Sequence, residues 1–287
     1  MIGQRGATRG ARVTRVRAGE GDDASTSQST EKDTLAVEEP FEIRVSWVEE
    51  DARRVESLAV TMRTPGADFE LAAGFLHGEG IVRFAQDVVD LTYCSGPEEQ
   101  EYNVVEVRLA PGIGVDVEAL RRNFYTTSSC GVCGKASLEA VGAIGCAPLG
   151  AGPTIEAHTI AELPARLRER QSVFARTGGL HAAGVFDQVG TPAVVMEDVG
   201  RHNAVDKAVG RLFLQRALPA VDSVLVVSGR ASFELVQKAV AAGIPVLVAV
   251  GAPSSLAVDL ARTFGQTLVG FARDGGFNVY TGEERIG

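Results

Sequence analysis

Cysteine is scarce in this sequence, and so are long apolar runs. The 287 residues contain four cysteines, whereas secreted domains that depend on disulfides carry many cysteines in a short chain. A disulfide framework is therefore excluded, and we expect a reducing, cytoplasmic environment. No apolar run reaches the ~18 residues that a membrane-spanning helix needs. The N-terminal stretch MIGQRGATRGARVTRVR is basic but lacks the apolar core of a secretory signal.

An excess of positive charge is also absent. The formal net charge is -9, which argues against sequence-independent binding of nucleic acid, because neutralising phosphates requires concentrated Lys and Arg. A local basic pocket for one nucleotide stays compatible with this balance. The hydrophobic content of 45% is typical of a globular protein with a sizeable core.

The composition divides the chain into three segments. Residues 1–33 form an N-terminal segment in which 19–33 has no large apolar side chain and predicts a mobile insertion, preceded by a possible short edge strand in ARVTRVR. Residues 34–126 combine strand patterns with one amphipathic helix, which predicts an α+β domain. In residues 127–287, the short apolar strands VLVVSG, VLVAV and TLVGFAR alternate with helical patterns. That alternation predicts an α/β domain with a mostly parallel sheet.

Particular residue types predict where helices begin and end. Asp68 is expected to cap the helix FELAAGFLHGEG, and Asn203 with Asp206 resembles a capping box at the start of the next well-defined helix. Pro164 is expected to interrupt the long helical pattern 158–177 early.

Two of the cysteines form a C-x-x-C pair, Cys130 and Cys133, within SSCGVCGKAS. The preceding RRNFYTTSS is polar and lacks strand periodicity, so we expect a loop rather than the strand–helix junction of thiol–disulfide oxidoreductases. Lys135 and a helix that starts beside it favour the thiolate form. An exposed thiolate can accept sulfane sulfur as a persulfide and pass it on. The pair thus indicates sulfur transfer, while two incidental core cysteines are the plain alternative.

Zinc binding is a further alternative for this pair. A structural zinc site needs four Cys or His ligands, normally in two close pairs, and the chain has one such pair. His77-Gly78-Glu79 followed by the cysteine pair imitates the signature of nucleobase deaminases, but Ser129 stands where that signature has proline. A surface position is the simpler expectation for His77.

Several long segments follow one another in a distinctive order: TSSCGVCGKASLE, GGLHAAG, MEDVGRHNAVDKAVG, VSGRASFELVQKAVAAGIPVLVAVGAPSSLAVDLA and GFARDGGFNVYTGEERI. Together they resemble the FdhD family, whose members are the sulfur carriers required for formate dehydrogenase activity. The resemblance extends over nearly the whole chain from Thr34. The acidic insertion at 19–33 is the visible departure.

The resemblance implies a specific function. Such a protein accepts sulfur from a cysteine desulfurase as a persulfide and delivers it to the molybdenum cofactor, in its bis(molybdopterin guanine dinucleotide) form, before this cofactor is inserted into formate dehydrogenase. It implies Cys130 as the persulfide carrier with Cys133 as its partner, a homodimer, and a cytidine deaminase-like fold, without that enzyme's metal site, for the C-terminal part. The implied cofactor-binding residues are Phe271, Ala272, Arg273, Asp274, Gly275 and Gly276. A nucleotide-binding chaperone without thiol chemistry and a zinc-dependent deaminase-like enzyme are the alternatives.

The implied cofactor segment suits ligand binding on its own chemistry. It follows an apolar strand, and ligands gather beyond the carboxyl ends of parallel strands. Arg273 can offer paired donors to a phosphate, and the two glycines let backbone amides approach closely. Residues 228–230 and 251–255 follow two other apolar strands and are expected at the same edge of the sheet.

A second polar cluster stands at the entrance of a helix. Asp198, Arg201, His202 and Asn203 could hold an anion or a guanine edge there, or serve only to cap the helix. His181 is either a ligand contact or a histidine at the edge of the core.

Overall fold

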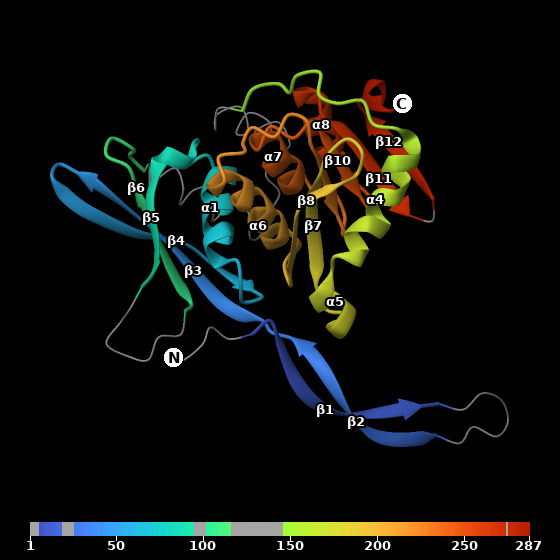
Figure 1. Cartoon of the computed structure of the whole chain (residues 1–287). Coiled ribbons are helices and arrows are strands. Elements are labelled where there is room, and N and C mark those ends of the chain that lie inside the picture. Colours follow the sequence, from blue (N-terminus) through green and yellow to red (C-terminus); the bar gives the residue numbers. More distant parts are fainter. Residues whose placement is uncertain (1–5, 19–25, 95–101, 116–145, 274) are drawn as a thin grey trace.

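The computed structural model describes residues 6–18, 26–94, 102–115, 146–273 and 275–287. Within these residues the chain forms a mixed α/β structure with three β-sheets (Figure 1). No helix in the described ranges is both long enough and apolar enough to cross a membrane.

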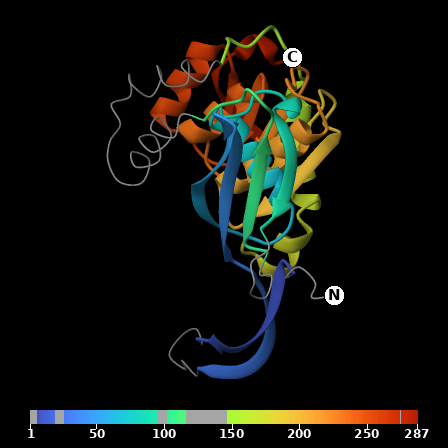
Figure 2. The ribbon, with the colours of Figure 1, turned by 90° about the vertical axis from the view of Figure 1, so that its left-hand side faces the viewer.

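The N-terminal strands form a ribbon that projects away from the body in both views (Figures 1 and 2). Strand β1 (Thr8–Arg17) pairs antiparallel with β2 (Ser27–Ala36), from Thr8 opposite Ala36 to Arg17 opposite Ser27. The edge strand expected in ARVTRVR is confirmed. Residues 27–33, which the composition assigns to a mobile insertion, instead belong to β2, because an unbroken antiparallel ladder satisfies their backbone without an apolar core. Residues 19–25 lie outside the described ranges.

A four-stranded sheet follows, and it lies in front in Figure 2. It consists of β3 (Glu39–Glu49), β4 (Ala52–Arg63), β5 (Val88–Tyr93) and β6 (Val104–Leu109) in the order β4-β3-β6-β5. A short 3-10 helix, η1 (Ala85–Asp87), precedes β5. Helix α1 (Asp68–Gly78) buries Leu71 and Leu76 against the apolar face of this sheet.

The larger sheet has six strands in the order β12-β11-β10-β9-β7-β8. Its strands are β7 (His181–Phe186), β8 (Pro192–Asp198), β9 (Val224–Val227), β10 (Val246–Ala249), β11 (Thr267–Arg273) and β12 (Gly276–Thr281). The parallel pairing of β9, β10 and β11 agrees with the sequence pattern. The expectation of a mostly parallel sheet is wrong, since the other pairings are antiparallel. Short turns, rather than helices, join β7 to β8 and β11 to β12, and tight turns reverse the strand direction.

Helices cover both faces of the six-stranded sheet. Helix α4 (Ala157–Glu169) packs on one face, and α6 (Arg201–Leu214), α7 (Phe233–Ala241) and α8 (Ser255–Phe264) pack on the other. Successive residues of β9 point to opposite helical layers, so both faces are buried and the strand is apolar throughout. The short helices α5 (Ser172–Thr177) and η2 (Glu283–Arg285) complete the described elements.

Three expected helix boundaries differ from the structure. Pro164 lies inside α4, and the helix continues to Glu169 before α5 begins at Ser172. Asp68 is the first residue of α1 rather than its cap, because its carboxylate is bound to Arg63 at 3.0 Å. Helix α6 already starts at Arg201, so Asn203 lies inside the helix and does not cap its N-terminus as expected.

Helices α1 and α6 cross with their backbones in direct contact. A Cβ atom at Gly74 would overlap the backbone carbonyl of Asp206, and one at Gly210 would overlap that of Glu70. Only glycine fits at either position without displacing a helix. The crossing joins the four-stranded sheet, through α1, to the helical layer of the six-stranded sheet.

Candidate functional site

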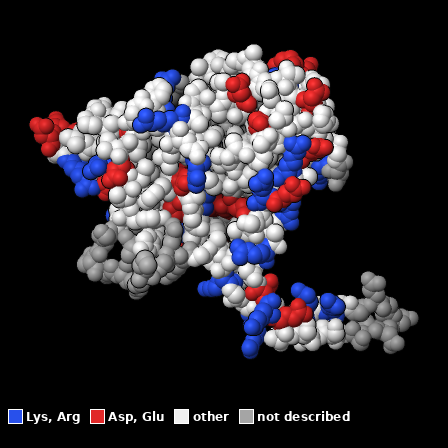
Figure 3. Space-filling model, viewed as in Figure 1, with Lys and Arg blue, Asp and Glu red and all other residues white. Residues whose placement is uncertain are grey.

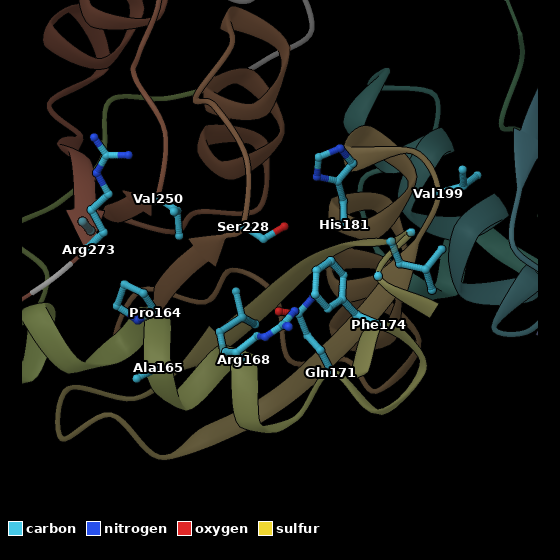
Figure 4. A pocket seen from close by; sticks show the side chains of 15 residues that line it. Pro164, Ala165, Arg168, Gln171, Phe174, His181, Val199, Ser228, Val250 and Arg273 are labelled. Atoms are coloured by element: carbon cyan, nitrogen blue, oxygen red, sulfur yellow. The ribbon is translucent and has the colours of Figure 1, made fainter. Parts of the chain in front are cut away.

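A cavity of about 640 Å³ opens at the carboxyl ends of the parallel strands (Figure 4). Ser228 follows β9, Val250 follows β10, and Ala272 and Arg273 end β11; all four line the cavity. Strand β7 runs in the opposite direction, so its first residue, His181, lies at the same edge. The sequence pattern therefore brings the ends of β9 and β11 together as expected.

Backbone hydrogen bonds fix the turns behind this edge. The Gly251 amide donates to the Gly229 carbonyl at 2.9 Å, and the Phe271 amide donates to the Gly251 carbonyl at 3.1 Å. The Ser228 hydroxyl accepts a hydrogen bond from the Ala182 amide at 2.9 Å. The three turns thus form one connected rim rather than independent loops.

The opposite wall comes from the break between α4 and α5. Arg168, in the last turn of α4, lies over the ring of Phe174 in α5, with its guanidinium carbon 3.6 Å from the ring centroid. Figure 4 shows the two side chains together at the cavity. A guanidinium on an aromatic face gives a flat cationic surface, which suits a planar ligand group such as a nucleobase. Gly178 and Gly179 continue this wall without side chains.

The charged side chains that line the cavity are basic. Arg168 and Arg273 are lining residues, and no Asp or Glu is among the lining residues that the structure describes. In a chain of net charge -9, a carboxylate-free cavity with two guanidinium groups favours an anionic ligand.

His181 stands next to a third basic group. Burial lowers the pKa of His181, and the positive charges of Arg201 and His202 lower it further. Arg201 and His181 both approach Gly229, and the Nε atom of Arg201 is buried without a hydrogen-bond partner among the described residues. The imidazole is therefore a neutral donor and acceptor at pH 7, with the Arg201 guanidinium beside it.

The polar cluster at the start of α6 is mostly structural. Asp198 is fully buried and lies 2.6 Å from the Lys207 ammonium. Its carboxylate also accepts hydrogen bonds from the Thr64 amide at 3.1 Å and from the Asn203 side chain at 3.1 Å. His202 pairs with Glu234 at 2.7 Å. Internal partners occupy Asp198, His202 and Asn203, which favours the structural alternative over an anion or guanine site for this cluster.

The structure places the expected site residues unevenly. Ala272 and Arg273 line the cavity. Phe271 is 37% exposed and is not a lining residue, and Gly275 and Gly276 lie in the exposed turn into β12. Asp274, Cys130 and Cys133 lie outside the described residues, so their assignment stays a prediction.

Sequence reasoning missed several lining residues, among them Arg168, Gln171 and Phe174. They sit in the pattern 158–177, which suggests one amphipathic helix with a solvated polar face. They reach the cavity because the chain bends between α4 and α5. The run RERQSVF contains no glycine or proline that would have marked this bend.

His77, the histidine of the deaminase-like signature, is not at the surface. It is 7% exposed, and its two ring nitrogens lie 3.2 Å from the Val82 carbonyl and 3.1 Å from the Ala241 carbonyl. The expected surface position is wrong, since α1 and α7 enclose this side chain. With both nitrogens facing carbonyl oxygens, the ring is not placed to bind a metal ion. Across the described ranges, no three His, Cys, Asp or Glu side chains are grouped closely enough to hold one.

Comparison with known proteins gives one consistent family. The model of the FdhD/NarQ family matches residues 36–287. The sulfur carrier protein FdhD of Streptomyces coelicolor is 54% identical over 263 residues, which is 90% of each chain. That of Mycobacterium tuberculosis is 53% identical over 264 residues, 90% of this chain and 93% of its own. The crystal structure of a candidate formate dehydrogenase accessory protein from Desulfotalea psychrophila matches with a TM-score of 0.69 and 25% identity, covering 96% of this chain and 99% of that one.

Proposed function

The chain belongs to the FdhD/NarQ family, and on that premise we propose that it is a sulfur carrier acting on behalf of formate dehydrogenase. It accepts sulfane sulfur from a cysteine desulfurase on Cys130 and transfers it to the molybdenum cofactor, in the bis(molybdopterin guanine dinucleotide) form, before that cofactor enters the enzyme. The names of the relatives and the C-x-x-C pair support this assignment.

The observation that carries the proposal is the chemistry of the cavity. Two arginines, no carboxylate among the described lining residues and the flat Arg168–Phe174 surface suit a ligand with phosphates and a planar base. A volume of about 640 Å³ lies within the usual range for a small-molecule site. We assign the cavity to one guanine nucleotide end of the cofactor, with Arg273 on the phosphates and Phe174 beneath the base.

The sulfur transfer balances without an added oxidant. The Cys130 thiolate attacks the outer sulfur of the desulfurase persulfide, that S–S bond breaks, and the desulfurase leaves as a thiolate. Attack by Cys133 on the sulfur bonded to Cys130 would then close a Cys130–Cys133 disulfide and release the carried sulfur as hydrosulfide, which counts as delivery only when the molybdenum cofactor, bound beside the pair, takes it up. Both cysteines would be oxidised in that step while the sulfur is reduced.

The finer structural expectations also belong to this proposal. The layers α4, six-stranded sheet and α6–α8 support a cytidine deaminase-like arrangement for the C-terminal part. We propose a cofactor-binding domain over 127–287, an α+β domain over 34–126 and a homodimer, as the family resemblance implies.

Mass spectrometry of the intact protein tests the sulfur step. After incubation with a cysteine desulfurase and cysteine, the wild-type mass should rise by the mass of one sulfur atom, and Cys130→Ala should stay unmodified. A formate dehydrogenase that matures normally with Cys130→Ala would instead establish the nucleotide-binding chaperone. Stoichiometric zinc by elemental analysis would favour the deaminase-like enzyme.

Calorimetric titration with guanosine diphosphate tests the cavity separately. Phe174→Ala should weaken binding by about tenfold, since stacking contributes on the order of 1–3 kcal/mol per base. Phe84→Ala is the matched control, because Phe84 also pairs with an arginine, Arg83, but lies before η1 and away from the cavity. Equal affinities of the two variants would remove Phe174 from the site.

A further inference from the structure

The side chain of Gln171 is buried at the cavity without a partner in the fold. It lines the cavity and is only 4% exposed. Its amide group forms no hydrogen bond with any residue that the structure describes. Such an amide carries one acceptor oxygen and two N–H donors. Buried polar groups in folded proteins are nearly always hydrogen-bonded, so this amide indicates a ligand in the cavity.

The backbone on either side of Gln171 is held in place. Gln171 lies in the bend between α4 and α5, and its backbone N–H donates to the Arg168 carbonyl at 3.2 Å. The Glu197 carboxylate accepts hydrogen bonds from the backbone amides of Val173 at 2.9 Å and Phe174 at 2.7 Å. These contacts already satisfy the first turn of α5. The fold therefore offers the side chain of Gln171, rather than the end of the helix, to a ligand.

Gln171 adjoins the flat cationic surface of the cavity. It lies midway along the chain between Arg168 and Phe174, whose side chains stack with the guanidinium carbon 3.6 Å from the ring centroid. Figure 4 shows these three side chains together on one side of the cavity, with His181 and Ser228 on the other. Proteins recognise a nucleobase by stacking on its face and hydrogen bonding to its edge. The stacking surface and a group that can read the edge thus lie side by side.

The cavity offers an excess of hydrogen-bond donors. Arg168 and Arg273 can only donate, and the described lining residues include no Asp or Glu. The outer face of α4 differs, because Glu162 pairs there with Arg166 at 2.8 Å, and Figure 3 shows basic and acidic side chains next to each other in this region. A donor-rich cavity favours a base with acceptor atoms. Guanine has O6 and N7 as acceptors, whereas adenine carries an amino group at position 6.

We propose that Gln171 selects a 6-oxopurine as the base of the bound nucleotide. Its amide N–H donates to O6 of the base, and its carbonyl oxygen accepts from N1–H. This inference rests on the proposed function, which places a guanine nucleotide in the cavity. The amide can turn over to pair with adenine, but the arginine N–H groups then meet an amino group at position 6 in place of an oxygen. The 2-amino group of guanine has no part in the pair, so hypoxanthine is accepted as well.

Calorimetric titration of the full chain with three nucleoside diphosphates tests this selection. The wild type should bind guanosine and inosine diphosphates within about threefold of each other, and adenosine diphosphate about tenfold or more weakly. Gln171→Leu removes both hydrogen-bonding groups and should reduce the preference for guanosine over adenosine diphosphate to within about twofold.

Gln171→Glu provides a second variant with the opposite expectation. Its carboxylate only accepts, which suits N1–H of guanine and opposes the N1 acceptor of adenine. The preference for guanosine diphosphate should therefore rise by about threefold or more. The added charge acts on the phosphates of both nucleotides alike, so the ratio of their dissociation constants isolates the recognition of the base.

Gln237→Leu is the matched control. Gln237 lies in α7, is not a lining residue, and donates to the Gly78 carbonyl at 3.3 Å. The same substitution there should leave the three dissociation constants within about twofold of the wild-type values.

The outcomes separate this inference from the proposed function. A preference for guanosine diphosphate that survives in Gln171→Leu overturns the role of Gln171, as does equal wild-type affinity for the guanosine and adenosine diphosphates. The cavity assignment stands in both cases if Phe174→Ala still weakens binding. A wild-type chain that binds none of the three nucleotides overturns the nucleotide site and this inference with it. Sulfur loading of Cys130, measured by mass, is independent of all these results.

Discussion

The α1–α6 crossing and the β1–β2 ribbon are opposite extremes of packing in one chain. At the crossing, a single added carbon at Gly74 or Gly210 would overlap backbone atoms of the other helix. On the ribbon, a Cβ at Gly10 would meet nothing within 4 Å. The crossing is formed by two helices of this chain, whereas the ribbon presents surfaces that the other described residues leave uncovered.

The charged residues follow the same division. Around the crossing, Lys238 lies 2.7 Å from Asp206 and Lys207 lies 2.6 Å from Asp198, all four buried. On the ribbon, Arg12 and Lys32 are exposed and face each other. Buried charges require partners within the fold. An exposed charge does not, so Arg12 and Lys32 can stay without an ion-pair partner among the described residues.

The largest expected effect comes from adding one methyl group at the crossing. Gly74→Ala should lower the free energy of unfolding by about 4 kcal/mol or more, because the helices must separate to admit the Cβ atom. Gly10→Ala, on the ribbon, should change it by less than about 0.5 kcal/mol. Urea denaturation gives the free energy of unfolding of both variants. Similar losses in the two would show that the crossing is no more tightly packed than the ribbon.

Breaking a buried ion pair should have the next largest effect. Lys207→Met leaves the Asp198 carboxylate in the interior without its cation and should cost about 3 kcal/mol of unfolding free energy. Arg108→Met removes the cation of an exposed pair with Asp90, 3.4 Å apart, and should cost under about 1 kcal/mol. Chemical denaturation at neutral pH measures the free energy of unfolding of both variants. An equal loss in the two would show that burial does not determine the cost of breaking an ion pair in this protein.

A smaller, pH-dependent effect is expected at His77. Burial lowers the pKa of His77 below 6.5, and this outweighs the two carbonyl contacts that raise it. The unfolded chain therefore binds the proton at higher pH, so the stability from neutral His77 is complete above pH 6.5 and is lost as the pH falls from there through the folded pKa. Each unit between the two values contributes about 1.4 kcal/mol.

Unfolding curves at several pH values isolate this contribution. His77→Gln should flatten the loss of stability below pH 6.5, while His158→Gln, at an exposed histidine, should keep the wild-type slope. A steeper slope in His77→Gln would mean that the carbonyl contacts dominate and that the charged ring is the stabilising form.

Local signals made part of this fold predictable. The strands β9, β10 and β11 are short continuous apolar runs, and the helical stripe of Val205, Val209 and Leu212 is buried as its spacing indicates. Parallel strands place their carboxyl ends at one edge, so the order of strands and helices along the chain is enough to assign Ser228 and Arg273 to one site.

Long-range fit was not predictable in the same way. Gly74 and Gly210 are 136 positions apart, and nothing in either helix pattern marks them as contact points. Strand β2 has a polar sequence that is typical of a loop, and only its ladder with β1 makes it a strand. Arg168 and Phe174 are in contact across the bend between α4 and α5, and no residue type in that segment predicts the bend.

Helix α5 gives the cavity and the ribbon a common neighbour. Phe174 of α5 lines the cavity, and the same helix contacts β2 at the root of the ribbon. Linkage between two equilibria is reciprocal, so if ligand binding at the cavity shifts α5 and with it the root of the ribbon, holding that root in place changes the ligand affinity by the same factor. The ratio of the two ligand dissociation constants, with the root free and with it held, would measure the coupling free energy.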